Sequence, residues 1–436
     1  MPKFRIITFG CKVNQVDSAG MAQGLVDLGW RGAVGGEAPD LVLVNTCTVT
    51  ARADQQARQA IRRQARECPG APLFITGCYA QRAPAELMAL QGVTAVLGNR
   101  EKGNLPQLMS HFAPDGPPLV RVSGYSPGEP FQAWQVRHFP GQTRARLKVQ
   151  DGCNHACAYC LVPQVRGPRR SLEAKDVAAA LKDLGQQGYQ EVVLTGIDLG
   201  QYGQDLSPAS SLAALLGRLA NRSWPFRLRL SSLEPQEITS ELLQALTAFP
   251  GLCPHFHLPL QSGSDPVLRA MRRPYRAQDF KNVVRELNRA FPEAALGLDI
   301  LVGFPGESTA DFTATYDLAA SLPISYLHVF PFSPRPGTPA ASLAPLPAPE
   351  VRRRASALRN LGWRKKLEFY QSQVGRMGEV LVEGPGLETG WLQGLSANYL
   401  RVILPGPPDW RNRRVRVRFQ KVQGESLLGE LMEPLE

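Results

Sequence analysis

The feature that most constrains the fold is the alternation of short apolar runs with helical patterns. In the first hundred residues, apolar runs at Phe4–Phe9, Leu41–Val44 and Leu73–Ile75 alternate with helical patterns at Asp17–Leu28 and Ala51–Glu67. Short continuous apolar runs are typical of strands buried on both faces of a parallel sheet. The series therefore predicts a small, doubly wound α/β domain over residues 1–112.

After a Pro/Gly-rich linker, 113–142, a longer βα series follows. Its expected strands are Arg146–Gln150, Glu191–Thr195, Phe226–Ser231, His255–Leu260, Leu296–Val302 and Tyr326–Phe330. Its expected helices are Ala174–Gly185, Ser211–Leu219, Ser240–Ala248, Ala277–Ala290 and Thr309–Ala320. Six such units predict a partial (β/α)6 barrel over 143–370, with the active site at the carboxyl ends of the strands. The series closes with a helix at Val351–Val374.

The last segment, 371–436, carries short alternating runs that predict a small β-barrel. Its expected strands are Glu379–Glu383, Tyr399–Leu404 and Arg414–Phe419. Alternation places Arg414, Arg416 and Arg418 on one face. Such a face fits an RNA surface, and it fits an ordinary solvated strand equally well, because 371–436 carries no net charge.

Charge and hydropathy narrow the functional class. The chain has 49 Lys and Arg against 38 Asp and Glu, a net charge of +11, which indicates a polyanionic partner. No run approaches the ~18 uncharged apolar residues of a spanning helix, and the start reads as a strand rather than a signal peptide. We therefore expect a cytoplasmic protein whose eight cysteines are not disulfides.

Three cysteines follow three predicted strands. Cys11, Cys47 and Cys78 each come within three residues of an apolar run. Because ligand sites form at the carboxyl ends of parallel strands, the three thiols are expected to converge on one metal site. The alternative is three separate buried thiols, which are common in protein cores. Cys68 and Cys253 lie beside prolines and are interpreted as structural.

Cys153, Cys157 and Cys160 form a C-x3-C-x2-C run directly after the first barrel strand. Three thiolates can hold three irons of a [4Fe–4S] cluster and leave the fourth iron open. A closed zinc site would need a fourth ligand. His155 is available for that role, although its position matches no zinc-finger spacing.

This run, with Tyr159 before its third cysteine, resembles the signature of the radical S-adenosylmethionine (SAM) enzymes. Other motifs resemble the methylthiotransferases within that group: Gly10-Cys-Lys-Val-Asn-Gln15, Asn45-Thr46-Cys47, Thr76-Gly77-Cys78-Tyr79, Cys160-Leu-Val-Pro-Gln-Val-Arg-Gly167 and Leu258-Pro-Leu-Gln-Ser-Gly-Ser-Asp265. The resemblance covers the whole chain. It implies an N-terminal cluster domain, a radical SAM barrel and a C-terminal RNA-binding barrel of the TRAM type.

Branches of this family differ in substrate: threonylcarbamoyladenosine in tRNA, isopentenyladenosine in tRNA, or an aspartate of a ribosomal protein. The cysteine motif after Gly10, the Ser262-Gly263 pair and His328-Val-Phe-Pro-Phe-Ser-Pro-Arg-Pro-Gly-Thr338 resemble the first branch. Val16-Asp17-Ser18 departs from it and resembles the ribosomal-protein branch. A zinc-stabilised RNA-binding module without catalysis is the alternative outside enzymes.

The resemblance implies a mechanism with two [4Fe–4S] clusters. Cys153, Cys157 and Cys160 would hold the cluster that binds and cleaves SAM, and Cys11, Cys47 and Cys78 the second cluster. SAM would serve both as radical source and as methyl donor, and a methylthio group would enter C2 of the adenosine at position 37, beside the anticodon. The expected partners are tRNA and an electron donor such as flavodoxin or ferredoxin, with no membrane and with the protein a monomer.

Several strand-end residues are candidates for SAM or substrate contacts. They are Thr195, Gly196, Ser231, Gln261 and Phe330, together with Tyr159 of the cysteine run. Ordinary turn chemistry is the alternative for each strand end. The Gly303–Gly306 turn could approach a cofactor closely because glycine has no side chain. Arg166 could meet SAM or a phosphate, or pair with a helix end.

Overall fold

The computed structural model describes the chain except for residues 111, 113–115, 127, 135, 387 and 435–436. The chain forms two compact units. The first unit contains Met1–His138, Lys148–Leu172 and Ser333–Ser342. The second contains Phe139–Leu147, Glu173–Phe332 and Leu343–Glu436.

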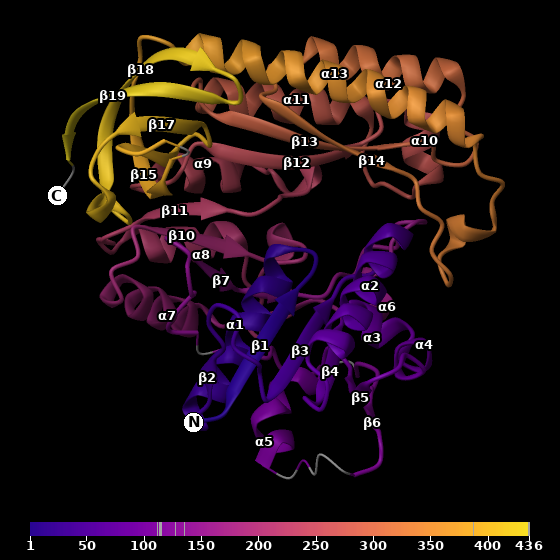
Figure 1. Ribbon diagram of the computed structural model, residues 1–436. Helices are drawn as coiled ribbons and strands as arrows, with labels where there is room; N and C mark the ends of the chain where they lie inside the picture. The colour runs from indigo at the N-terminus through magenta and orange to yellow at the C-terminus, as the bar shows by residue number, and fades with distance from the viewer. Residues whose placement is uncertain (111, 113–115, 127, 135, 387, 435–436) are drawn as a thin grey trace. The chain divides into compact units, whose positions relative to one another are not determined.

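The first unit is built on a six-stranded parallel sheet with the order β2-β1-β3-β4-β5-β6 (Figure 1). Its strands are β1 (Lys3–Thr8), β2 (Arg31–Gly32), β3 (Leu41–Thr46), β4 (Leu73–Gly77), β5 (Val93–Leu97) and β6 (Leu119–Arg121). The order reverses beside β1, as in flavodoxin-like sheets, and such a point is where ligands bind. The predicted doubly wound domain is confirmed, while β2, β5 and β6 were not predicted.

Helices cover both faces of this sheet. The helices of this unit are α1 (Lys12–Asp27), α2 (Ala51–Glu67), α3 (Cys78–Arg82), α4 (Pro84–Met88), α5 (Leu105–Ser110) and α6 (Val162–Arg166), with 3-10 turns η1 (Glu101–Asn104) and η4 (Pro339–Ser342). Val42 and Val44 pack with Ile61 of α2, whereas Leu43 packs with Met21 of α1. Because successive side chains point to opposite faces of a strand, β3 contributes to the hydrophobic core on each face of the sheet.

The second unit holds the predicted βα series. Its strands form two three-stranded sheets, β11-β10-β7 and β12-β13-β14. They are β7 (Arg144–Lys148), whose last residue belongs to the first unit, β10 (Glu191–Thr195), β11 (Arg227–Leu230), β12 (His255–Gln261), β13 (Ala295–Val302) and β14 (Tyr326–Pro331). The six strands expected from the sequence are all present, and β12, β13 and β14 pair in parallel. The short strands β8 (Gln150–Asp151) and β9 (Arg170–Ser171) pair separately, in the first unit.

Helices follow the strands of the second unit. They are α7 (Ala174–Gln186), α8 (Leu212–Ala220), α9 (Ser240–Ala248), α10 (Asp265–Ala270), α11 (Ala277–Ala290), α12 (Thr309–Ser321) and α13 (Ala348–Gln373), with 3-10 turns η2 (Leu199–Gln201), η3 (Pro235–Glu237) and η5 (Pro408–Trp410). Figure 1 shows α11, α12 and α13 beside the β12–β14 sheet. Three of these helices begin with side-chain caps: Ser308 Oγ accepts from Asp311 N, Thr239 Oγ1 from Leu242 N, and Ser211 Oγ from Ala214 N.

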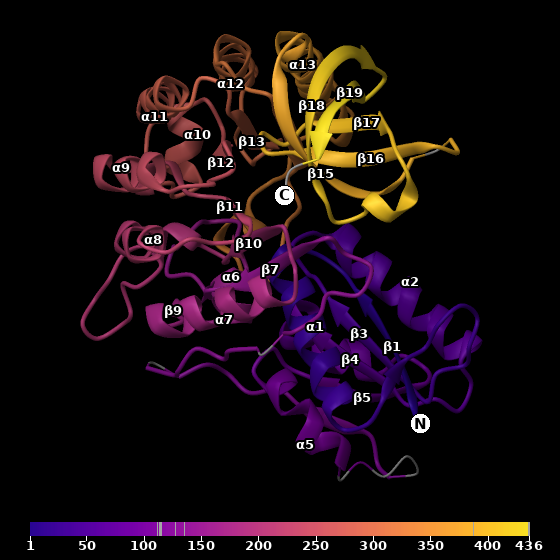
Figure 2. The same ribbon diagram turned by 90° about the vertical axis from the view of Figure 1, so that its left-hand side faces the viewer.

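The C-terminal residues form a closed five-stranded barrel with the order β15-β16-β17-β19-β18 (Figure 2). Its strands are β15 (Met377–Pro385), β16 (Trp391–Ser396), β17 (Arg401–Pro405), β18 (Arg414–Gln423) and β19 (Ser426–Pro434). Tyr370 of α13 contributes to the barrel core with Val380 and Phe419. The predicted small barrel is confirmed. Across the described residues, no helix combines the length and the hydropathy needed to cross a membrane.

Candidate functional site

The first three predicted ligands all lie where strands of the parallel sheet end. Cys11 directly precedes α1, Cys47 directly follows β3, and Cys78 is the first residue of α3, directly after β4. Cys47 and Cys78 are buried, whereas Cys11 is exposed. The three thiols thus lie along the carboxyl edge of β1, β3 and β4, which are neighbours in the sheet.

Contacts between these loops confirm that they meet. A Cβ atom added to Gly10, which has φ +93°, would lie 2.7 Å from Cys47 Cβ and 2.9 Å from its Sγ. Only glycine fits this approach and this backbone conformation. Burial, together with the neighbouring Cys78 and Cys11, raises the pKa of the Cys47 thiol to about 12. A metal ion would stabilise the thiolates that burial disfavours.

Two asparagines of the cysteine motifs hold the loops together. Asn14 Nδ2 donates to Phe9 O at 2.8 Å and to Thr46 O at 3.0 Å. Asn45 Nδ2 donates to Asn14 O at 2.9 Å. Both side chains are buried. Their role in the motif is therefore to satisfy the carbonyl groups of the cysteine-bearing loops, because buried polar groups need partners.

The second cysteine group lies in the loop between β8 and α6, also in the first unit. Cys157 is buried, and Cys153 and Cys160 are half-buried. Backbone N–H groups point at two of the sulfurs: His155 N lies 3.4 Å from Cys153 Sγ, and Val162 N lies 3.4 Å from Cys160 Sγ. Hydrogen bonds to sulfur of this kind stabilise cluster thiolates, so the loop fits an iron–sulfur group.

The predicted SAM contacts form three groups. Tyr159 is half-buried in the cysteine loop of the first unit. Thr195, Gly196 and Ser231 lie at neighbouring strand ends in the second unit, where Gly196 N donates to Ser231 Oγ at 3.4 Å. These positions match the sequence prediction, and their contact with SAM stays a prediction.

Gln261 and Phe330 belong to the other sheet of the second unit. Gln261 ends β12 with φ 61°, at a shift in the register to β13. This left-handed conformation is uncommon for a residue other than glycine and occurs often at functional sites. Phe330 lies on β14 and is 44% exposed. Its ring is therefore available to a ligand.

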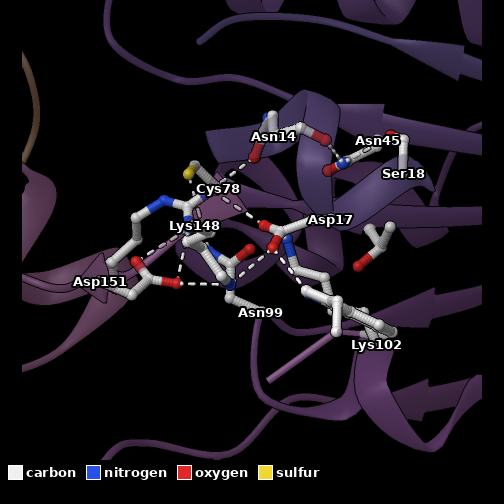
Figure 3. A network of polar contacts seen from close by, with 12 residues as sticks. Asn14, Asp17, Ser18, Asn45, Cys78, Asn99, Lys102, Lys148 and Asp151 are labelled. Carbon is white, nitrogen blue, oxygen red and sulfur yellow. Dashed lines mark hydrogen bonds and ion pairs between the residues drawn. The ribbon is translucent and has the colours of Figure 1, made fainter. Parts of the chain in front are cut away.

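Sequence reasoning missed a cluster of buried charges in the first unit (Figure 3). We call it the buried charge cluster; its members are Asp17, Lys102, Lys148, Asp151 and Arg166. Asp17 lies at its centre, 2.6 Å from Lys102 Nζ and 2.7 Å from Lys148 Nζ. Arg166 Nη2 lies 3.2 Å from the same carboxylate.

The charges of this cluster stabilise one another. Burial raises the pKa of Asp17, but Lys102, Lys148 and Arg166 outweigh that effect and hold it well below its ordinary value. Burial likewise raises the pKa of Asp151, which Arg166 and Lys148 lower. Burial lowers the pKa of Arg166, but Asp151, Cys78, Asp17 and Cys11 raise it well above its ordinary value. The cluster is thus electrostatically coupled to the thiols of the sheet edge.

The contacts of Arg166 differ from the sequence prediction, which placed it against SAM, a phosphate or a helix end. Its guanidinium is 2% exposed and binds Asp151, Asn14 and Asp17, so it is engaged inside the protein rather than at a helix end. Asp17, noted in the sequence only as a departure from a motif, is the centre of this network. No sequence signal could have joined it to Lys148, because 131 positions separate them.

Comparison with known proteins shows which families these segments of the chain match. Residues 3–98, which contain Cys11, Cys47 and Cys78, match the family described as "Uncharacterized protein family UPF0004". Residues 147–319, which contain the second cysteine group, match the "Radical SAM superfamily". Over 419 residues the chain is 35% identical to the threonylcarbamoyladenosine tRNA methylthiotransferase MtaB of Bacillus subtilis (strain 168), covering 95% of this chain and 93% of that protein.

The chain belongs to the radical SAM methylthiotransferases. It is also 35% identical to MtaB of Thermotoga maritima, over 97% of this chain and 96% of that protein. A tRNA-2-methylthio-N(6)-dimethylallyladenosine synthase of Pelotomaculum thermopropionicum is 33% identical, over 99% and 98%. Membership of this family means that the chain is an enzyme. The alternative of a zinc-stabilised RNA-binding module without catalysis is excluded.

A solved structure supports the fold of the family. The radical SAM methyltransferase TsrM of Kitasatospora setae has a TM-score of 0.56 at 17% identity, covering 78% of this chain and 75% of that one. The family implies a [4Fe–4S] cluster and SAM, and the N-terminal match is consistent with a second cluster.

Proposed function

We propose that this enzyme inserts a methylthio group at C2 of N6-threonylcarbamoyladenosine at position 37 of tRNA. The observation that carries the proposal is the presence of two separate cysteine trios in one compact unit, one at a sheet edge and one in the β8–α6 loop. Relatives named for this substrate match the chain over nearly its full length.

Each trio has the residues to hold a [4Fe–4S] cluster. Cys153, Cys157 and Cys160 would hold the cluster that binds SAM; Cys11, Cys47 and Cys78 would hold the second. Three ligands leave one iron of each cluster open to another molecule. When bound, these groups supply the radical that activates a C–H bond and the site at which sulfur is methylated.

The chain's own residues supply position and protection from water. The asparagines at the sheet edge fix the three cysteine loops, and burial of Cys47 and Cys78 excludes solvent from two of the thiols. Backbone N–H groups orient Cys153 and Cys160. Adenine C2 carries an unactivated C–H bond without a leaving group, so positioning matters more here than acid–base catalysis.

The proposed partners follow from the reaction. The substrate is tRNA, and electrons would come from a flavodoxin or ferredoxin in the cytoplasm. Thr195, Gly196, Ser231, Gln261, Phe330 and Tyr159 are the proposed SAM or substrate contacts.

The deciding experiment compares tRNA nucleosides and ribosomal proteins from wild-type cells and from a strain lacking this protein. We expect the methylthio form of threonylcarbamoyladenosine to disappear and its unmodified form to accumulate. Loss of the methylthio group from isopentenyladenosine instead would favour the branch represented by the Pelotomaculum relative. Loss of the aspartate modification alone would show that the substrate is the ribosomal protein.

A further inference from the structure

A cavity of about 280 Å³ lies in the first unit, beside the buried charge cluster. Its wall contains Asp17, Lys148 and Asp151 of that cluster, together with Asn99 and Arg170. A water molecule takes about 30 Å³ in the liquid, so the cavity has room for a small ligand with several waters.

Arg170 presents an unused hydrogen-bond donor in this wall. Its side chain is 6% exposed, and Nη2 donates to Arg166 O at 2.9 Å. The guanidinium carbon lies 4.2 Å from the centre of the Tyr125 ring, which covers one side of it. Within the described part of the chain, Nη1 has no hydrogen-bond partner. A buried guanidinium nitrogen without a partner is costly, which points to a ligand.

Asn99 presents an unused acceptor and connects the cavity to a predicted metal ligand. Its amide nitrogen donates to Val165 O at 2.7 Å and lies 3.6 Å from Cys78 Sγ. These contacts fix the orientation of the amide. Its Oδ1 atom has no partner among the residues that the structure describes, and the side chain is 4% exposed. The Asn99 side chain therefore lies between the cavity and the thiol of Cys78.

The local charge favours an anion. Four buried cations share two buried carboxylates: Lys102, Lys148, Arg166 and Arg170 against Asp17 and Asp151. Glu129, also in the cavity wall, is paired with Arg100 at 3.1 Å. Buried charge without compensation is unfavourable. Thiolates at the sheet edge can balance part of the surplus, and an anion in the cavity would balance the rest.

We propose that this cavity binds hydrosulfide, the small sulfur anion that the reaction must acquire. This inference rests on the proposed function, because methylthio transfer consumes a sulfur atom that has to reach the site of Cys11, Cys47 and Cys78. Hydrosulfide offers lone pairs to Arg170 Nη1 and an S–H donor to Asn99 Oδ1. Its charge complements the surplus of buried cations, and Asn99 lies between it and Cys78.

The test uses hydroselenide, the heavier analogue, as the probe. Anaerobic crystals of the reconstituted full-length protein are soaked with sodium hydroselenide, and anomalous diffraction is measured at the selenium edge. We expect a selenium peak in the cavity, within hydrogen-bond distance of Arg170 and Asn99. An empty cavity in the wild-type protein overturns the proposal. So does equal occupancy after soaks with bromide, bicarbonate or phosphate, since the site would then hold any anion.

Two variants and a control locate the site. Arg170→Gln removes the guanidinium donor. Asn104→Trp places a large side chain in the cavity from an exposed position and removes no buried hydrogen bond. Both should lose the cavity peak. Arg62→Gln, which removes an exposed cation of α2, should keep it. A peak that survives in Asn104→Trp would contradict binding in this cavity even if Arg170→Gln fails to fold.

Kinetics separate this inference from the proposed function. In Arg170→Gln, the sulfide concentration that gives half-maximal product formation should rise about tenfold, the loss expected for a charge-assisted hydrogen bond, and Asn104→Trp, which fills the cavity, should raise it at least as much. The half-maximal concentrations of SAM and RNA should not change. If the wild-type protein makes the methylthio nucleoside while its cavity stays empty, only the cavity proposal fails. If no methylthio nucleoside depends on this protein, the proposed function fails.

Discussion

One guanidinium nitrogen of Arg166 lies 2.9 and 3.1 Å from the two carboxylate oxygens of Asp151. The other nitrogen reaches Asn14 Oδ1 at 2.5 Å and Asp17 Oδ2 at 3.2 Å. Arg166 follows the cysteine loop that ends at Cys160, and Asn14 follows Cys11. A single buried side chain thus links the two cysteine groups within the first unit.

Replacing Arg166 should therefore destabilise the first unit strongly. Arg166→Met removes a cation that, like Lys148, contacts both Asp151 and Asp17, and breaking a buried ion pair in this way costs about 3–5 kcal/mol of unfolding free energy. Arg166→Lys keeps the charge but cannot reach both sides, so we expect a smaller loss. Urea unfolding followed by circular dichroism measures both. Arg353→Met, in an exposed pair with Glu350, should change stability by less than about 1 kcal/mol. Equal effects at the two sites would contradict the role of the cluster.

Iron content tests the two cysteine groups. After anaerobic reconstitution we expect about eight irons per chain, and about four in Cys47→Ala, because each trio holds one four-iron cluster. Cys68→Ala and Cys253→Ala should keep the wild-type iron content, since both thiols are buried outside the trios. Zinc without labile sulfide in the wild-type protein would contradict both cluster assignments.

Glu191 should make the second unit sensitive to acid. It is fully buried, 2.7 Å from Arg227 Nε and 2.7 Å from Arg229 Nε. Burial raises its pKa, but Arg229 and Arg227 outweigh this effect and hold the pKa well below its ordinary value of 4.5. Because the folded pKa is depressed, the stabilisation is complete above pH 4.5 and is lost as the pH falls below it.

The free energy of unfolding between pH 7 and pH 3 checks this prediction. The wild-type protein should lose stability more steeply on acidification than Glu191→Gln, whose amide does not titrate. Glu241→Gln, exposed on α9, should follow the wild-type profile. Parallel curves for wild type and Glu191→Gln would show that Glu191 does not carry the acid sensitivity.

The same arginines should anchor the C-terminal barrel. Arg227 Nη2 donates to Leu395 O at 2.8 Å, and Arg229 Nη1 donates to Ala397 O at 3.0 Å. Without the Glu191 carboxylate these guanidinium groups lose their orientation. We expect limited proteolysis to release residues 371–436 faster from Glu191→Ala than from wild type, with no change for Glu241→Ala.

The arginine face of β18 should contribute little to RNA binding. Arg416 lies 2.9 Å from Glu433, and Arg418 is paired in register with Glu430. These carboxylates offset the cations that the sequence places on one face. The slope of log tRNA affinity against log salt concentration should therefore change in Arg416→Gln by less than the contribution of one phosphate contact. Glu433→Gln should strengthen tRNA binding at low salt. A large loss of affinity in Arg416→Gln would restore this face as an RNA surface.

The sequence predicted many of the strands and the position of three thiols at one sheet edge. Leu41–Val44, Leu73–Ile75 and Glu191–Thr195 were recognisable as strands because strands buried on both faces need continuous apolar runs. A cysteine after each of three such strands placed three thiols at one edge, since parallel strands end on the same side. The strands β2, β5 and β6 were missed because they are short or lack a comparable run.

The sequence by itself determined the parallel α/β architecture and the two cysteine groups, because periodicity and local spacing are properties of neighbouring residues. Only the tertiary structure decided the role of the charges. It gathered Asp17, Lys102, Lys148, Asp151 and Arg166 into one buried cluster, and it opposed Arg416 with Glu433. Burial and long-range pairing set the energy of a charge, and neither is encoded in the spacing of residues along the chain.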